Sequence, residues 1–174
     1  GGTSVTGSGG DGGTAGTGGQ GGSGTTTSGG GGTGAGEPVP GQQSLTFGPV
    51  KVESGSENTQ CIQARLGNLD LLRAHQIHNV LSNGSHHMIV YRTTDTEEKL
   101  TPYDCQPFTD ALDPSKGSPL MITQKHDEVL TLPDNVAFTL DPNQMIRLEV
   151  HFVNASAAAI DLSATTTFIP IAEG

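Results

Sequence analysis

Beyond residue 40 the chain is divided by turn signals into short runs rich in Val, Ile, Thr and Phe. This pattern restricts the fold more than any other feature of the sequence. Groups such as SNGS, LDPSKGSP, LPDN and LDPNQ are typical of turns and separate many of the runs. No stretch keeps a 3.6-residue apolar period for three turns, and β-branched and aromatic residues favour strands. We therefore expect strands almost throughout, with a helical turn considered for LGNLDLLRA (66–74).

Eight or nine short strands are predicted in this part of the chain. The candidate strands are 44–53, 61–66, 74–82, 86–92, 120–124, 128–132, 137–140, 145–154 and 160–171. So many short strands in one domain indicate an antiparallel β-sandwich or jelly roll. The predicted fold class is all-β, a jelly-roll-like sandwich.

The first 36 residues have a different composition, because 19 of them are glycine and almost none are apolar. Such a segment cannot bury a core and is predicted to be a disordered Gly/Ser/Thr-rich tether. Residues 37–174 remain, and their number matches one ordinary domain.

Charge and hydropathy exclude some classes of partner. Eight basic against 18 acidic residues give a net charge of −10, which argues against nucleic acid and favours cations. No window approaches 18 consecutive apolar residues, so no membrane-spanning segment is expected. Because the chain opens on Gly-Gly-Thr, we interpret it as a processed, extracytoplasmic product, with a lipid anchor upstream of residue 1 as one alternative.

The two cysteines, Cys61 and Cys105, fit an exported protein if they form a disulfide. Two buried thiols are the alternative. Thiolate metal ligation is a third, although neither cysteine belongs to a CxxC pair.

Three of the six histidines are placed favourably for a metal. In MIRLEVHFV the apolar residues alternate, so His151 is expected to point away from the core. His86 and His87 precede a buried strand where the NGS turn still bends the chain, and a bulge there would let both imidazoles converge. The alternatives are a solvated His151 and, at the strand mouth, one core and one solvated histidine. Together the three make a plausible three-nitrogen site with open coordination positions.

The other candidates are weaker. His75 and His78 should point to opposite faces of a strand, and His126 lies in a polar turn. Asp104, Asp110 and Asp113 fall in a loop and could hold calcium, but they lack EF-hand spacing.

Several further features bear on the site. Met88 is expected to be a core residue and not an axial ligand, and Tyr91 and Tyr103 are expected to pack. Acidic residues near strand ends could orient the imidazoles, but the sequence does not identify them. No cupin, HExxH, GxSxG, Walker or dinucleotide motif occurs.

One order of motifs resembles a known family. CIQARLG is followed 25 positions after its cysteine by HHM, then by a cysteine 18 positions beyond His87, and much later by LEVHF. This order resembles the N-terminal domain of the copper type II, ascorbate-dependent monooxygenases, which include peptidylglycine α-hydroxylating monooxygenase and dopamine β-monooxygenase. It covers about residues 45–170. The resemblance implies an electron-transfer copper on His86, His87 and His151, a family disulfide between the two cysteines, and a jelly-roll-like sandwich.

The resemblance also limits the functional prediction. In the family, a second copper on an HxH pair and a methionine of a following domain binds oxygen and hydroxylates a small-molecule or peptide substrate. This sequence contains no HxH pair. We therefore expect the copper-binding half of an ascorbate-dependent monooxygenase if a second domain accompanies it. The alternatives are an exported copper redox or carrier protein without hydroxylase activity, a zinc hydrolase on the three histidines and a metal-free binding sandwich.

Overall fold

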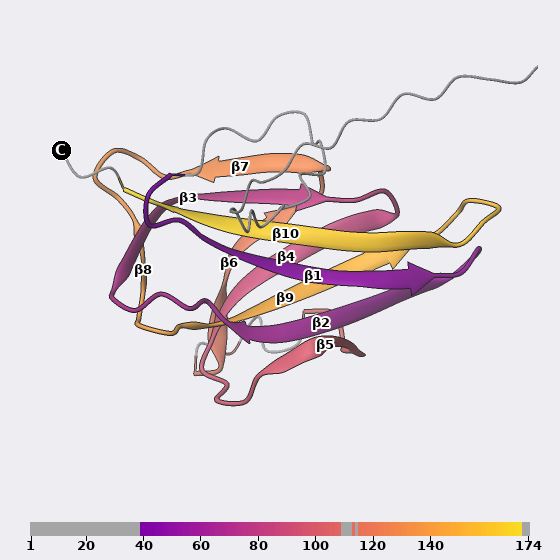
Figure 1. Ribbon diagram of the computed structural model, residues 1–174, viewed down its shortest axis with the longest axis horizontal. Helices are drawn as coiled ribbons and strands as arrows, with labels where there is room; N and C mark the ends of the chain where they lie inside the picture. Colours follow the sequence, from indigo (N-terminus) through magenta and orange to yellow (C-terminus); the bar gives the residue numbers. More distant parts are fainter. Residues whose placement is uncertain (1–38, 109–112, 114, 172–174) are drawn as a thin grey trace, which may run out of the picture. The chain divides into compact units, whose positions relative to one another are not determined.

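Two antiparallel β-sheets form the described part of the chain (Figure 1). The structure is a computed structural model and describes residues 39–108, 113 and 115–171. The chain separates into two units, residues 1–35 and 36–174. The predicted tether of residues 1–36 lies outside the described residues.

The first sheet has five strands. In spatial order they are β1 (Gln43–Val52), β10 (Ile160–Pro170), β3 (Leu72–Leu81) and β7 (Asp127–Thr131), with β8 (Phe138–Leu140) also paired to β3. All of these pairings are antiparallel.

The second sheet also has five strands and carries the three candidate histidines. In spatial order they are β5 (Lys99–Asp104), β2 (Glu57–Arg65), β9 (Met145–Val153), β4 (Ser85–Thr93) and β6 (Gly117–Thr123). Strand β9 is central, with β2 on one side and β4 on the other.

The connectivity is that of a jelly roll. Without β5 and β8, the sheets read β1-β10-β3-β7 and β2-β9-β4-β6, so most successive strands change sheet. Eight strands wound in this way form the double-sheet jelly roll. The predicted all-β, jelly-roll-like sandwich is confirmed.

The core lies between the two sheets. Phe47, Ile77 and Phe168 of the first sheet and Val90 and Leu148 of the second are fully buried there. The apolar face predicted for β9 is also confirmed, and its members are Ile146, Leu148, Val150 and Phe152. Burying each such side chain contributes about 1.5–3 kcal/mol, which explains why these residues fix the register.

One local prediction was wrong, and one strand was not predicted. The segment 66–74 contains no helical turn: residues 66–71 form a loop, and Leu72 begins β3. The Asn68 side chain holds this loop by donating to the carbonyl oxygens of Asp70 and Asp141. Strand β5 was not predicted, because it lies at a sheet edge with few buried side chains and contains Pro102, a residue type that is depleted in strands.

The predicted disulfide between Cys61 and Cys105 is confirmed, with a Cα–Cα distance of 5.8 Å. It joins β2 to the residue that follows β5. Both cysteines are consumed, so neither thiolate ligation nor buried thiols remain as alternatives.

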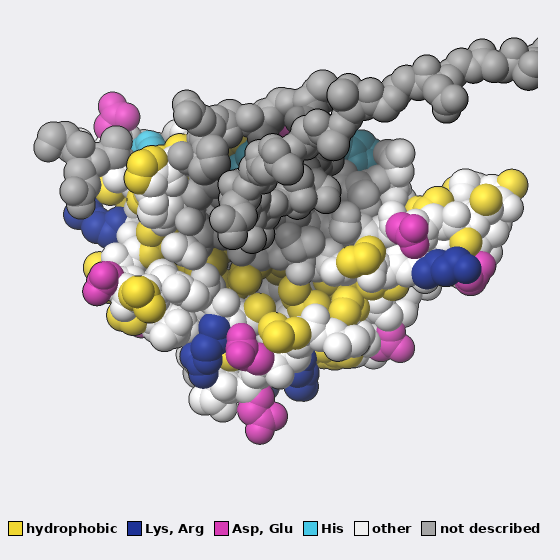
Figure 2. Space-filling view, viewed as in Figure 1, with side chains coloured by type: hydrophobic (Ala, Val, Ile, Leu, Met, Phe, Trp, Pro, Cys, Tyr) yellow, Lys and Arg dark blue, Asp and Glu magenta, His cyan; other side chains and the backbone are white. Residues whose placement is uncertain are grey.

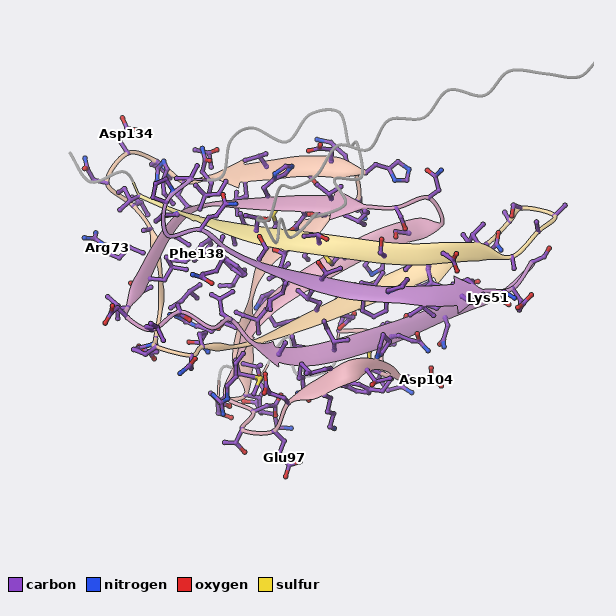
Figure 3. The ribbon with its side chains drawn as sticks, viewed as in Figure 1. Lys51, Arg73, Glu97, Asp104, Asp134 and Phe138 are labelled. Carbon is purple, nitrogen blue, oxygen red and sulfur yellow. A yellow bond between two sulfur atoms is a disulfide. The ribbon has the colours of Figure 1, made fainter. Side chains whose placement is uncertain are left out.

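The surface of this domain carries side chains of both charges. Figure 2 shows basic and acidic side chains interspersed on its visible face. In Figure 3, Lys51 marks the end of β1, while Arg73 and Phe138 lie at the opposite end of the strands.

Within the described ranges, no helix has the length and apolar character needed to cross a membrane.

Candidate metal centre

Strand β4 begins with a shift in its register against β9. Ser85 faces Phe152 of β9, but the next aligned pair is His87 and His151, so two steps on β4 match one step on β9. His86 is therefore the extra residue of a β-bulge, which turns the chain at this point. The shift lies where the sequence indicated a bend.

The bulge explains how neighbouring histidines can face one another. His87 and His151 are cross-strand partners, so their side chains share the outer face of the second sheet. In a regular strand His86 would point to the opposite face. As the bulged residue it instead approaches both partners, with ring-centroid distances of 5.4 Å to His87 and 5.1 Å to His151.

The ring nitrogens of the three histidines converge. The Nδ1 atom of His86 lies 3.2 Å from Nδ1 of His87 and 3.4 Å from Nδ1 of His151. One ligand atom from each of the three lies within 4.8 Å of the others, so this group could hold a metal ion. His86 is exposed, and the other two are half-buried.

These separations fit nitrogen ligands of one ion. Imidazole nitrogens bind at about 2.0–2.1 Å, so two of them at angles of about 90–110° lie roughly 2.9–3.4 Å apart. Hydrogen bonding gives a poorer account, because one Nδ1 of His86 cannot serve both neighbours equally well. The donor set therefore suits a shared cation.

The carboxylate of Glu57 orients one of the rings. Its Oε1 atom accepts a hydrogen bond from Nε2 of His151 at 3.0 Å. Because a carboxylate only accepts, Nε2 carries the proton, and the lone pair of His151 is on Nδ1. This is the nitrogen that faces His86, and an outer partner of this kind is usual for metal-binding histidines.

His87 has the most enclosed ring of the three. Its Nε2 atom is buried and has no hydrogen-bond partner among the described residues. Phe108 stacks on the ring at 6.0 Å with an interplanar angle of 23°. Burial lowers the pKa of His87, and the neighbouring imidazoles of His151 and His86 lower it further. The neutral ring, which is the form that binds metals, is therefore favoured.

The remaining histidines lie elsewhere. His75 bonds the carbonyl of Val136, and His78 pairs with Asp127. His126 lies in the turn between β6 and β7 and bonds the backbone carbonyl of Leu81. In the described ranges, the three-histidine cluster is the only such group of histidine, cysteine or acidic side chains.

The acidic residues that were candidates for calcium, and Met88, do not belong to the histidine cluster. Asp104 accepts hydrogen bonds from the amides of Asn58 and Gln60, and Asp113 accepts from Ser115. Asp110 lies outside the described residues. Met88 is fully buried in the core, as expected.

Tyr91 and Tyr103 pack, as expected, and each ring contacts a cationic side chain. Arg147 lies over the ring of Tyr91, and Lys99 lies over that of Tyr103. Burial raises the pKa of Tyr91, and the Glu149 carboxylate, which accepts its hydroxyl hydrogen bond, raises it further.

Sequence reasoning did not identify three residues around the site: Glu57, Phe108 and Glu149. Glu57 belongs to the expected class of acidic residues near strand ends, but only the register of β2 against β9 selects it. Phe108 follows a cysteine by three positions, and the disulfide is the one signal that could have placed it near the sheet.

Fold and site together define a disulfide-bonded jelly-roll domain with a three-histidine cluster that could hold a metal ion. No protein-family model matches the chain, and no curated protein is significantly similar to it.

Proposed function

We propose that this domain binds one copper ion through His86, His87 and His151 and serves as the electron-transfer half of an ascorbate-dependent copper monooxygenase. The observation that carries the proposal is the convergence of the three Nδ1 atoms at the bulge of β4. The order of the HHM, EVHF and cysteine motifs supports copper in particular.

The donor set favours copper over other metals. Three imidazoles without a thiolate or thioether suit Cu(II), which binds such nitrogen ligands more tightly than Zn²⁺ does. Met88 is buried in the core and both cysteines are bridged. When bound, copper would supply a one-electron Cu(II)/Cu(I) couple, for which ascorbate is the reductant in the family that the sequence resembles.

The residues of the chain have distinct parts in this function. The β4–β9 ladder fixes His87 opposite His151, and Glu57 keeps the proton of His151 away from the cluster. His86 is exposed, so a small reductant can approach the site from that side. Hydroxylation of a small-molecule or peptide substrate would take place at a second copper, on ligands of another domain.

An anaerobic Cu(II) titration followed by EPR tests the proposal. We expect one tightly bound Cu(II) per chain, with nitrogen hyperfine structure, and a signal that ascorbate bleaches. The His151→Ala variant should lose or alter this signal. His126→Ala is the matched control, because this histidine lies in the β6–β7 turn and bonds only a backbone carbonyl.

Two outcomes of this titration would contradict the proposal. The first is the absence of stoichiometric copper in the native chain. The second is an identical spectrum in the native chain and in His151→Ala, because Cu(II) would then be bound at another place. A bound copper that ascorbate does not reduce would favour a carrier over an electron-transfer domain.

A further inference from the structure

The outer face of the second sheet is covered, although sandwich sheets commonly expose this face. On this face, Glu149 of β9 is paired with Cys61 of β2 on one side and with Ile89 of β4 on the other. Each of these three side chains is at most 1% exposed. The edge strands of this sheet are β5 and β6. The described residues 105–108 follow β5 and lie on this outer face, against Cys61 and His87.

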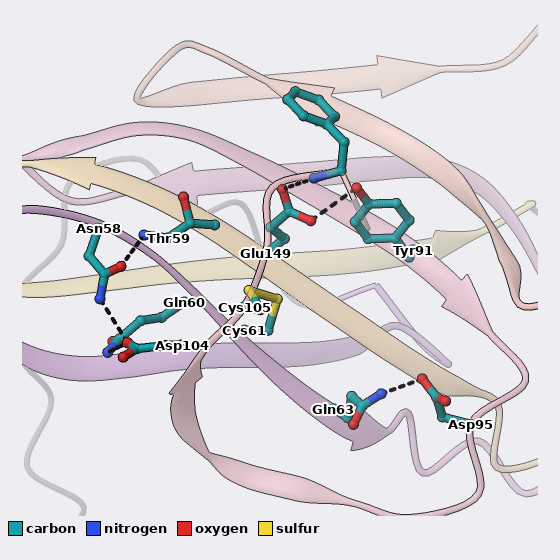
Figure 4. Close-up of a disulfide and its surroundings, with 11 residues drawn as sticks. Asn58, Thr59, Gln60, Cys61, Gln63, Tyr91, Asp95, Asp104, Cys105 and Glu149 are labelled. Carbon is teal, nitrogen blue, oxygen red and sulfur yellow. Dashed lines mark hydrogen bonds between the residues drawn. A yellow bond between two sulfur atoms is a disulfide. The ribbon is translucent and has the colours of Figure 1, made fainter. Parts of the chain in front are cut away.

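The disulfide is the first anchor of this segment. Cys105 is bonded to Cys61 on β2, and its backbone N–H donates to the carbonyl of Thr59. Figure 4 shows the bridge beside the β2–β9 ladder, close to Glu149. The chain is thereby held against the face that also carries the histidine cluster.

The second anchor is the buried carboxylate of Glu149. One oxygen accepts the hydroxyl of Tyr91 at 3.1 Å, as drawn in Figure 4, and the other accepts the backbone N–H of Phe108 at 3.0 Å. A fully buried carboxylate is costly unless its oxygens are hydrogen-bonded. Glu149 therefore holds the backbone of Phe108 firmly.

Phe108 carries this constraint to the cluster. Its backbone has a positive φ of 57°, and its ring stacks on His87. Phe108 as a whole residue is 54% exposed, so the stacking on His87 and not burial in the core explains the position of its ring. Glu149 also lies two residues before His151 on the same face of β9.

We propose that residues 105–108, fixed by the Cys61–Cys105 disulfide and by Glu149, hold His87 in its metal-binding orientation through Phe108, so that reduction of the disulfide weakens metal binding. The inference rests on the proposed function, because it concerns the same three-histidine site. It assigns Phe108 and Glu149 as positioning residues, since neither needs to touch the metal.

The redox step requires a dithiol as co-reactant. One dithiol transfers two electrons and two protons to the bridge. The S–S bond breaks, Cys61 and Cys105 become thiols, and the dithiol leaves as its own disulfide. The segment then loses its covalent anchor and is held by hydrogen bonds, among them those of Cys105 to Thr59 and of Phe108 to Glu149, so the ring of Phe108 is positioned less firmly on His87.

Three variants separate the effect of the ring from that of the bridge. Phe108→Leu removes the stacked ring but keeps an apolar side chain, and Phe108→Tyr keeps the ring. Cys61→Ser with Cys105→Ser removes the bridge without leaving thiols that Cu(II) could oxidise. Leu100→Ala is the matched control, because Leu100 is an exposed apolar residue of β5.

Two readouts are needed: Cu(II) affinity by competition with a chelator, and the imidazole NMR signals of the metal-free protein. We expect Phe108→Leu and the double serine variant to bind Cu(II) about 10-fold more weakly, the scale of lost outer contacts at metal sites. Phe108→Tyr and Leu100→Ala should bind as the native chain does. The His87 ring signal should show a ring-current shift that Phe108→Leu abolishes.

The outcomes separate this inference from the proposed function. If the native chain binds Cu(II) and both Phe108→Leu and the double serine variant bind it equally tightly, the inference is overturned while the proposed function stands. A native chain that binds no Cu(II) overturns both. Should the double serine variant not fold, Phe108→Leu decides alone, and an unshifted His87 signal in the native protein also contradicts the inference.

Discussion

At the scale of single residues, Glu57 decides which nitrogen of His151 faces the cluster. Its carboxylate accepts a hydrogen bond from the Nε2–H group, so Nδ1 presents its lone pair to His86. The candidate ligands could be predicted from sequence, because a bend before a buried strand and an alternating strand both leave readable patterns. Glu57 could not, because its pairing depends on the register between β2 and β9.

Replacing Glu57 by Gln should weaken Cu(II) binding about 10-fold, because an amide orients the imidazole less strongly and no longer raises its basicity. Competition with a chelator measures this change. Glu53→Gln is the control, since Glu53 is an exposed acidic residue that contacts Lys51 and not the cluster. Equal affinity in Glu57→Gln and Glu53→Gln would contradict the assigned role.

The lowered pKa of His87 makes the metal-free domain less stable in mild acid. In the unfolded chain an imidazole titrates near its ordinary pKa of about 6.5. As the pH falls through that value, the unfolded chain takes up a proton that folded His87 resists, so the free energy of unfolding decreases. The loss is complete below the folded pKa and absent well above 6.5.

Urea unfolding between about pH 8 and pH 5 measures this effect. His87→Gln should show a smaller decrease in unfolding free energy over that range than the native chain. If both proteins give the same dependence on pH, burial and the neighbouring imidazoles do not disfavour the charged form of His87.

At the scale of elements, the turn before β4 sets the bulge. Gly84 has a positive φ of 91°, and its carbonyl accepts a hydrogen bond from the backbone of Val153. A Cβ at this position would meet the side chain of Ile160. The turn is therefore fixed to β9 next to His151, and glycine meets both its conformation and its close packing.

Gly84→Ala should cost about 1–2 kcal/mol for the left-handed backbone alone, and it should also weaken Cu(II) binding by displacing His86 and His87. Gly55→Ala provides a close control, because Gly55 also has a positive φ but has nothing near its added Cβ. Denaturant unfolding and Cu(II) affinity measure the two effects. Loss of stability without loss of affinity would separate the turn from the site.

The Cys61–Cys105 disulfide joins two elements, because it links β2 to the residue that follows β5. Its cysteines are 44 positions apart, and on the chain-entropy model such a bridge stabilises the fold by about 4 kcal/mol. Cys61→Ser with Cys105→Ser should lower the unfolding free energy by roughly this amount in urea. A loss below about 1 kcal/mol would contradict this chain-entropy estimate.

At the scale of the whole described domain, the jelly roll brings the HHM and EVHF motifs together. Some 60 residues separate these motifs in the sequence, yet β4 and β9 are neighbours in the second sheet. The strand pattern was enough to predict an all-β sandwich, because apolar alternation and turn residues are local. The strand pattern could not predict the strand order, the edge strand β5 or the covering of the outer face, because these depend on long-range contacts.

X-ray absorption of the copper-loaded domain tests the central claim most directly. It reports the ligands of the bound ion and its oxidation state together. We predict three imidazole nitrogens at about 2.0 Å, two in His151→Ala, and an edge that moves to Cu(I) when ascorbate is added. A sulfur shell, fewer than three imidazoles, or the same ligand set in His151→Ala would contradict the copper centre on His86, His87 and His151.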